Sequence, residues 1–290
     1  MQGRNNLQFA DANSTYADST FVLFGVPFDN TCSFRTGARF GPAAVRTASY
    51  NFETWLFAHG IDLAEEAIFD WGDVHDFAIV DQMVAEVEQV ATPFAKDGKV
   101  PMVIGGEHSI SAPWIGAYAT RNKLACIQVD AHLDFRDSYQ GLANSHACAA
   151  ARIVDRIGVE NHVVIGARSI CREEHERATE LGLRWYSAFD VRDRTLKAVV
   201  QEALDYLKPE RVIVTLDIDG IDPAYAPGTG TPEPFGLTPM EVRQLLIEVG
   251  PRLVGFDVNE IAPVYDQGIT AALAARMVRE AMGIVARHRA

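Results

Sequence analysis

The chain has 290 residues, of which 48% are hydrophobic and 22% are charged, an ordinary globular composition. Its formal net charge of -13 disfavours binding to nucleic acid or to an anionic membrane. No apolar run approaches the roughly 18 residues of a membrane helix, and the first residues lack the pattern of a secretory signal. The four cysteines have no CxxC spacing, which argues against a disulfide framework or a thiolate zinc site. We therefore expect a cytoplasmic protein.

Residues 1–20 are polar and aperiodic, and we expect them to form a loose N-terminal segment. After them, short apolar runs alternate with longer stretches of helical period. The runs that we expect to be strands cover residues 21–27, 67–73, 100–106, 124–130, 163–168, 211–219 and 253–260. The periodic stretches predict helices at residues 81–96, 172–182, 196–207 and 269–287. A further helix has a start signal in Thr238, Pro239 and Glu241.

This alternation predicts an α/β fold, in which a doubly wound, mostly parallel sheet carries helices on both faces. Several of the strand runs are apolar on both faces, as strands buried between two helical layers are. No repeat, low-complexity tract or linker divides the sequence, so we expect one domain over residues 1–290. In such a sheet, ligands bind beyond the carboxyl ends of the strands.

Polar residues able to bind a metal or a substrate stand where four of the predicted strands end. Their order along the chain is Glu107 and His108, then Asp130, His132 and Asp134, then Asp217, Asp219 and Asp222, then Asp257 and Glu260. A single aspartate at a strand end is usually a turn former or a helix cap. We expect that role for Asp222, which precedes Pro223, and a structural role for Asp257. Glu107 is ambiguous, because its side chain could cap the following helix.

The remaining residues of these patterns predict a metal centre. A carboxylate near the interior must be paired or bound to a cation. Alternate residues of a strand lie on one face, which groups Asp130, His132 and Asp134, and also Asp217 and Asp219, if the extended conformation persists. Oxygen-rich sets with one or two imidazoles suit Mn²⁺. Two ions that share carboxylates would form a hydrolytic centre.

Three motifs, "GGEHS", "DAHLD" and "DIDGIDP", resemble those of the arginase/agmatinase family, the ureohydrolases. The resemblance runs over nearly the whole chain, from "GVPFDNTCSFRTGARFGPAAVR" through "NSHA" to "GFDVNEIAPVYDQGIT". It implies an arginase-like three-layer fold and two Mn²⁺ ions per subunit. It also implies two ligand sets that share Asp130 and Asp217 as bridges. One set is His108, Asp130, Asp134 and Asp217, and the other is Asp130, His132, Asp217 and Asp219.

The resemblance further implies hydrolysis of a guanidinium group to urea and an amine. A metal-bridging hydroxide would attack the guanidinium carbon, and Asp134 would orient that hydroxide and take its proton. Glu260 resembles the family carboxylate that pairs with the guanidinium, and His146 resembles the histidine that relays a proton to the leaving amine. The family is commonly trimeric or hexameric, so the resemblance implies a homo-oligomer.

The segment "LDFRDSYQGLANSHA" resembles the agmatinase branch of the family rather than the arginases. We therefore expect conversion of agmatine to urea and putrescine. Glu107 in "GGEHS", the pair Ala147 and Cys148, and Phe235 depart from common agmatinase patterns. These departures leave 4-guanidinobutyrate, 3-guanidinopropionate and arginine open as substrates, and the physiological metal is open as well.

Two other classes of protein are alternatives. A metal-binding regulator without activity would have a broken ligand set, whereas this sequence holds all of the expected ligands. A single-zinc deacylase on a similar sheet would bind one zinc ion per chain.

Overall fold

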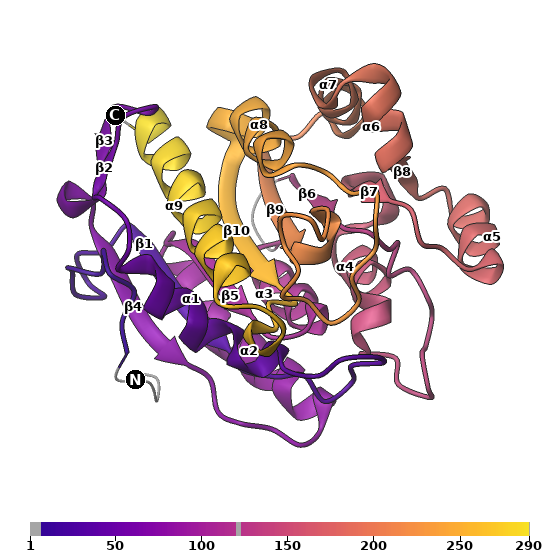
Figure 1. Cartoon of the computed structure of the whole chain (residues 1–290), viewed down its shortest axis with the longest axis horizontal. Coiled ribbons are helices and arrows are strands. Elements are labelled where there is room, and N and C mark those ends of the chain that lie inside the picture. The colour runs from indigo at the N-terminus through magenta and orange to yellow at the C-terminus, as the bar shows by residue number, and fades with distance from the viewer. Residues whose placement is uncertain (1–6, 120–122, 290) are drawn as a thin grey trace.

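Eight parallel strands form one sheet in the order β4-β1-β5-β10-β9-β6-β7-β8 (Figure 1). This computed structural model describes residues 7–119 and 123–289. In chain order the strands are β1 (Phe21–Val26), β4 (Ile68–Asp73), β5 (Val100–Gly105), β6 (Leu124–Val129), β7 (His162–Ala167), β8 (Arg184–Ser187), β9 (Arg211–Asp217) and β10 (Leu253–Asn259). A small antiparallel pair joins β2 (Trp55–Leu56) to β3 (Ile61–Asp62).

Helices cover both faces of the sheet and complete three layers (Figure 1). In chain order they are α1 (Gly41–Ser49), α2 (Val80–Lys96), α3 (Ser111–Tyr118), α4 (Ala149–Ile157), α5 (Arg172–Leu181), α6 (Ala188–Arg194), α7 (Leu196–Leu207), α8 (Pro239–Val249) and α9 (Ile269–Arg289). One core packs α1, α6, α7, α8 and α9 against the sheet, and a second packs α2, α3 and α4 against it. A smaller third cluster packs α4 and α5 beside β7. The predicted fold class is confirmed.

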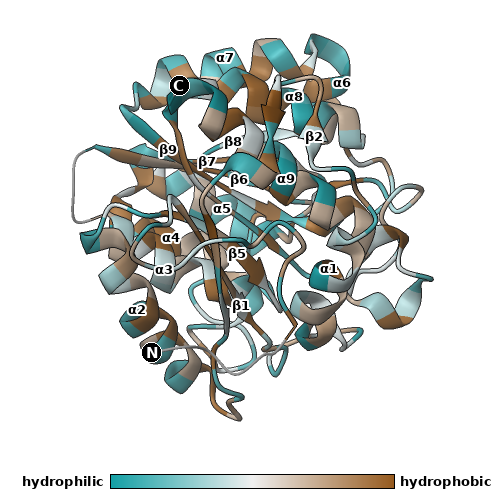
Figure 2. Ribbon diagram, turned by 90° about the vertical axis from the view of Figure 1, so that its left-hand side faces the viewer, coloured by the Kyte–Doolittle hydropathy of each residue, from teal (hydrophilic) through white to brown (hydrophobic). Residues whose placement is uncertain are grey.

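The strand residues show why both faces are covered. Along β1, Phe21 and Leu23 enter one core, while Val22 and Phe24 enter the other. Successive side chains of a strand point to opposite faces, so an entirely apolar strand needs a helical layer on each side. In Figure 2 the strands inside the molecule are largely hydrophobic, and the helices turn hydrophilic residues outward. None of the described helices combines the length and apolarity that a bilayer crossing needs.

Most of the predicted elements are present, with small shifts of their ends. The helix start at Thr238 is confirmed, because Thr238 and Glu241 form a capping box ahead of α8. Strand β8 was not among the predicted strands. It has four residues at the edge of the sheet, and its burial does not follow the apolar pattern of the inner strands.

The prediction of a loose N-terminal segment is wrong for residues 7–20, whereas residues 1–6 lie outside the described part. Phe9 is buried in the core, and its backbone N–H donates to Asp70 Oδ2 (2.8 Å). Asp11 is buried and forms an ion pair with Arg279 of α9. The buried ring of Phe9 and the carboxylate of Asp11 therefore anchor residues 7–20, although this segment is polar in composition.

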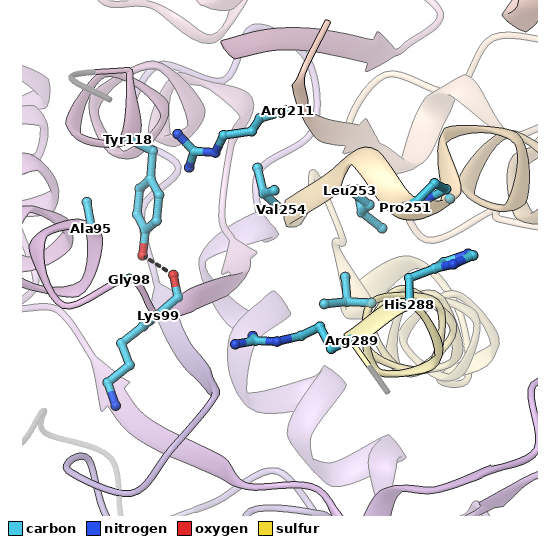
Figure 3. Close-up of a pocket in the computed structure, with 12 residues that line it drawn as sticks. Ala95, Gly98, Lys99, Tyr118, Arg211, Pro251, Leu253, Val254, His288 and Arg289 are labelled. Atoms are coloured by element: carbon cyan, nitrogen blue, oxygen red, sulfur yellow. Dashed lines mark hydrogen bonds between the residues drawn. The ribbon is translucent and has the colours of Figure 1, made fainter. Parts of the chain in front are cut away.

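A hollow of about 380 Å³ opens at the amino edge of the sheet, where β5, β9 and β10 begin (Figure 3). Lys99, Arg211, His288 and Arg289 are among the residues that line it, and the hydroxyl of Tyr118 donates to the Lys99 carbonyl (3.1 Å). The candidate site lies at the opposite, carboxyl edge, as the fold class predicts.

Candidate metal centre

Four neighbouring strands, β5, β10, β9 and β6, bring the predicted site residues together. Residues near the strand ends pair in register, since Val129 lies opposite Leu216, and Asn259 lies opposite Asp217. Parallel strands in such a register end at the same edge of the sheet. The segments that follow them therefore meet there, although they are far apart in sequence.

Two groups of side chains lie close enough for each to hold one metal ion. Potential ligand atoms of the first group lie within 4.8 Å of one another, and they belong to His108, Asp130, Asp134 and Asp217. The second group meets the same limit and consists of Asp130, His132 and Asp219. All six candidate ligands are thus brought together, and Asp130 is common to both groups. Asp217, which was expected in both, belongs only to the first.

The ligand-bearing segments do not stay extended, so that part of the prediction is wrong. β6 ends just before Asp130, and Asp219 lies in a 3-10 turn after β9. Asp130 Oδ1 accepts from the backbone N–H of His132 (2.7 Å), and Asp217 Oδ1 accepts from that of Asp219 (2.9 Å). Such aspartate turns compete with the extended backbone. Asp134 has a φ of 49°, in the left-handed region that few side chains adopt.

A chain of buried hydrogen bonds fixes the tautomer of His108. The hydroxyl of Thr215 donates to Asp257 Oδ1 (2.6 Å), because the carboxylate can only accept. Thr215 Oγ1 also lies 3.0 Å from His108 Nε2 and therefore accepts the proton of that nitrogen. Asp257 accepts further bonds from Trp114 (2.8 Å) and Asn259 (2.7 Å). Asp257 is structural, as predicted, but it acts on a site residue through Thr215, which the sequence did not single out.

The other ring nitrogen of His108 has the surroundings of a metal ligand. His108 Nδ1 is buried without a hydrogen-bond partner among the described residues. It faces three carboxylate oxygens, those of Asp130 (3.1 Å), Asp134 (3.3 Å) and Asp217 (3.3 Å). A nitrogen lone pair aimed at converging carboxylates fits a divalent cation, and the oxygen-rich set suits a hard or borderline ion.

The pKa shifts show that this cluster attracts positive charge. Burial raises the pKa of Asp134 to about 7, and the charge of Asp130 adds to the effect. Burial also raises the pKa of Asp217 well above its usual range, together with the charges of Asp219 and Asp130. Burial acts against the charged form of His108, but the surrounding carboxylates outweigh it and raise the pKa of that imidazole. A bound cation would relieve this repulsion between carboxylates.

Glu260, which was expected to pair with a guanidinium, lies next to the cluster on a strained backbone. Its φ is 62°, a conformation that is costly for a residue with a side chain. The side chain is buried, and Oε1 accepts from the backbone N–H of His108 (2.8 Å). Burial, and next the charge of Glu107, raise the pKa of Glu260 well above its usual range. Strain at a buried carboxylate is typical of functional sites.

Glu107 does not cap the short helix that follows it. Its carboxylate instead accepts from the backbone N–H of Thr31 (2.8 Å), the hydroxyl of Thr31 (2.5 Å) and the hydroxyl of Ser109 (2.7 Å). Burial raises the pKa of Glu107 to about 7, although these bonds oppose the shift. The neighbouring Gly106 allows this loop to approach Phe28, since a Cβ there would lie 1.9 Å from the Phe28 carbonyl oxygen.

His146 lies at a hollow of about 380 Å³ that opens onto the metal cluster. The residues lining this hollow are Ser33, His132, Asp134, Arg136, Tyr139, His146, Ala147, Ser169, Ile170, Cys171, Glu174 and Thr231. Burial, and then the charge of His132, lower the pKa of His146 to about 4. The hollow therefore combines the imidazole of His146 and two predicted metal ligands with further polar side chains, such as Arg136 and Glu174.

The remaining residues singled out from the sequence lie in a turn, at the hollow, in the interior and on the surface. Asp222 shapes a turn as predicted, because its carboxylate accepts from the backbone N–H groups of Ala224 and Gly236 (2.9 Å each). Ala147 lines the hollow, whereas Cys148 is buried with its thiol toward the Leu142 carbonyl oxygen. Phe235 is 76% exposed and has a φ of 68°. Glu107, Ala147, Cys148 and Phe235 depart from common agmatinase patterns, and of these four residues only Ala147 lines the hollow.

Known proteins resemble the chain over nearly its whole length. The model of the Arginase family matches residues 19–283. The agmatinase of Bacillus anthracis is 37% identical over 278 residues, which is 94% of each chain. An N(1)-aminopropylagmatine ureohydrolase of Thermococcus kodakarensis is 36% identical over 276 residues, covering 92% of this chain and 91% of the relative. The crystal structure of the agmatine ureohydrolase of Thermoplasma volcanium superimposes with a TM-score of 0.93 at 38% identity, covering 99% of this chain and 96% of that one.

Proposed function

Because the chain belongs to the arginase family and is an agmatinase-like ureohydrolase acting on guanidino C–N bonds, we propose that it hydrolyses agmatine to urea and putrescine with two bound Mn²⁺ ions. The binding of two ions is supported by a set of four aspartates and two histidines, all buried except the half-buried His132, in which His108 Nδ1 faces three carboxylates without a hydrogen bond. The substrate part rests on the agmatinases among the relatives.

In this proposal, His108, Asp130, Asp134 and Asp217 would hold one ion. Asp130, His132 and Asp219 would hold the other, to which the family resemblance also assigns Asp217, although the structure groups Asp217 with the first set. When bound, a pair of divalent cations would lower the pKa of a bound water and so supply a nucleophile at neutral pH. Asp130 is central in this assignment, since it belongs to both groups of side chains.

Three side chains of the protein would then act on the substrate. The buried carboxylate of Glu260 pairs with the guanidinium, which aligns the carbon that is attacked. Asp134 lies at the hollow and accepts the proton that leaves the attacking water. His146 relays a proton, which its imidazole first takes up, to the nitrogen of the departing amine. The C–N bond then breaks, and urea and the neutral amine are released.

A charged side chain that lines the hollow favours a substrate whose tail ends in an amine. Glu174 lines it as a buried carboxylate whose Oε1 accepts from the backbone N–H of Phe135 (2.7 Å). A carboxylate there is a suitable partner for the ammonium end of agmatine. Arg136 lines the same hollow and stacks on Tyr139, with 5.0 Å between guanidinium and ring centre. That guanidinium would favour a carboxylate tail, so 4-guanidinobutyrate is the substrate to compare.

A urea-release assay with Mn²⁺ tests the proposal. It compares agmatine, N(1)-aminopropylagmatine, 4-guanidinobutyrate, 3-guanidinopropionate and arginine under the same conditions. We expect the highest kcat/KM for agmatine. A higher value for another guanidine would contradict the substrate and leave the two-metal chemistry intact. Metal analysis that found a single zinc ion per chain would contradict the two-metal proposal.

A further inference from the structure

Glu107 is a completely buried carboxylate that belongs to neither metal group. It accepts three hydrogen bonds from neutral donors, and two of them come from Thr31, which precedes it by 76 residues in the chain. Oε2 binds the Thr31 backbone N–H (2.8 Å), and Oε1 binds the Thr31 hydroxyl (2.5 Å). Glu107 therefore fixes both the position of Thr31 and the direction of its hydroxyl proton.

The oxygen of Thr31 is also in contact with His146. Because the hydroxyl proton points to Glu107, Thr31 Oγ1 can only accept from its other neighbours. It accepts from the backbone N–H of His146 (2.9 Å) and lies 3.2 Å from His146 Nδ1. Ser145 Oγ lies 3.3 Å from the same nitrogen. This arrangement places the ring proton on Nδ1.

The second ring nitrogen of His146 is directed elsewhere. Nε2 lies 3.3 Å from Ser33 Oγ, and both Ser33 and His146 line the hollow beside the metal cluster. With the proton of the neutral ring on Nδ1, Nε2 is the nitrogen that takes up and releases a proton toward the hollow. A fixed tautomer of this kind is what a carboxylate provides for the histidine of a serine hydrolase.

We propose that Glu107 and Thr31 are positioning residues for His146, in which the carboxylate orients the threonine hydroxyl and the hydroxyl holds the imidazole in the tautomer that presents Nε2 to the substrate. The inference rests on the proposed function, in which His146 donates a proton to the leaving amine. It gives the glutamate of "GGEHS" a role separate from metal binding, because its carboxylate binds Thr31 and belongs to neither metal group.

Thr31→Val removes the hydroxyl and keeps the shape of the side chain and the backbone bond to Glu107. We expect kcat to fall about 10- to 100-fold, which is less than the roughly 10²–10⁴-fold contribution of a general acid because His146 itself remains, while KM and the metal content stay unchanged. Thr31→Ser restores the hydroxyl and is expected to recover most of kcat. If Thr31→Val does not fold, Glu107→Gln replaces it, with the same expected loss of kcat.

A spectroscopic measurement separates this role from a purely structural one. Long-range ¹H–¹⁵N correlation spectra of the Mg²⁺-supplemented protein report which nitrogen of His146 carries the proton. We expect Nδ1–H in the wild type and in Thr31→Ser, and a shift toward Nε2–H in Thr31→Val. An Nε2–H tautomer in the wild type, or a Thr31→Val enzyme with unchanged kcat, would overturn the proposal. The spectra need no substrate, so they test it even if no guanidine is hydrolysed.

Discussion

Replacing Thr215 with valine should weaken metal binding without touching a metal ligand. Valine has nearly the same shape but no hydroxyl, so the buried Nε2–H of His108 loses its acceptor. Asp257 keeps its bonds from Trp114 and Asn259, and the cost therefore falls on His108. An unsatisfied buried donor costs about 1–3 kcal/mol. Loss of the group that orients a metal-binding histidine typically lowers affinity about 10- to 100-fold, which corresponds to about 1.4–2.7 kcal/mol.

Calorimetric titration of the chelator-treated protein with Mn²⁺ measures this loss of metal affinity directly. We expect Thr215→Val to weaken one of two binding steps by this factor, and Thr215→Ser, which retains the hydroxyl, to bind as the wild type does. The circular dichroism of the variants serves as a control for folding. If Thr215→Val bound both ions with unchanged affinity, the tautomer assigned to His108 would be incorrect.

Three further predictions concern other parts of the molecule. His132→Ala should bind one metal ion per chain and lose most of its activity, and metal analysis that still found two ions would refute the assignment of His132. Glu260→Gln should lower kcat/KM about 10- to 150-fold, because a charged hydrogen bond of about 1.5–3 kcal/mol is lost, and unchanged kinetics would exclude Glu260 as the guanidinium partner. Burial opposes the ionisation of Glu280, but hydrogen bonds from His59 and Arg276 outweigh it and lower the pKa of this carboxylate. The ionised carboxylate therefore stabilises the fold above pH 4.5, and this stabilisation is lost as the pH falls through the lowered pKa. Glu280→Gln should therefore unfold more easily than the wild type at pH 7, and the difference in denaturant midpoint should shrink in acid; a difference independent of pH would contradict this.

The sequence predicted the fold and the composition of the site because both depend on local patterns. Apolar runs on two faces indicate a covered parallel sheet, and polar residues at the ends of such runs must meet at its carboxyl edge. The six candidate ligands follow from that rule, and the structure brings them together. Their roles as ligands, like those of His146 and Glu260 in catalysis, stay predictions, as do the single domain, the homo-oligomer and the cytoplasmic location.

The features that the sequence did not predict depend on contacts between distant segments. Thr215 reaches His108 because β9 lies beside β10 and close to β5. Glu107 reaches Thr31 across 76 residues, and Phe9 is held by Asp70 across 61. The extended conformation expected for the ligand segments was also wrong, because backbone N–H groups donate to the side chains of Asp130 and Asp217 and turn the chain there. No pattern within one segment encodes these pairings.

The cluster of four aspartates and two histidines is proposed to hold two ions for guanidine hydrolysis. The most direct test of this proposal is urea release from agmatine during titration of the chelator-treated protein with Mn²⁺, with bound metal measured in the same samples. We predict that activity rises to its maximum at two Mn²⁺ per chain. Full activity at one ion per chain, or no urea from any guanidine at two, would contradict it.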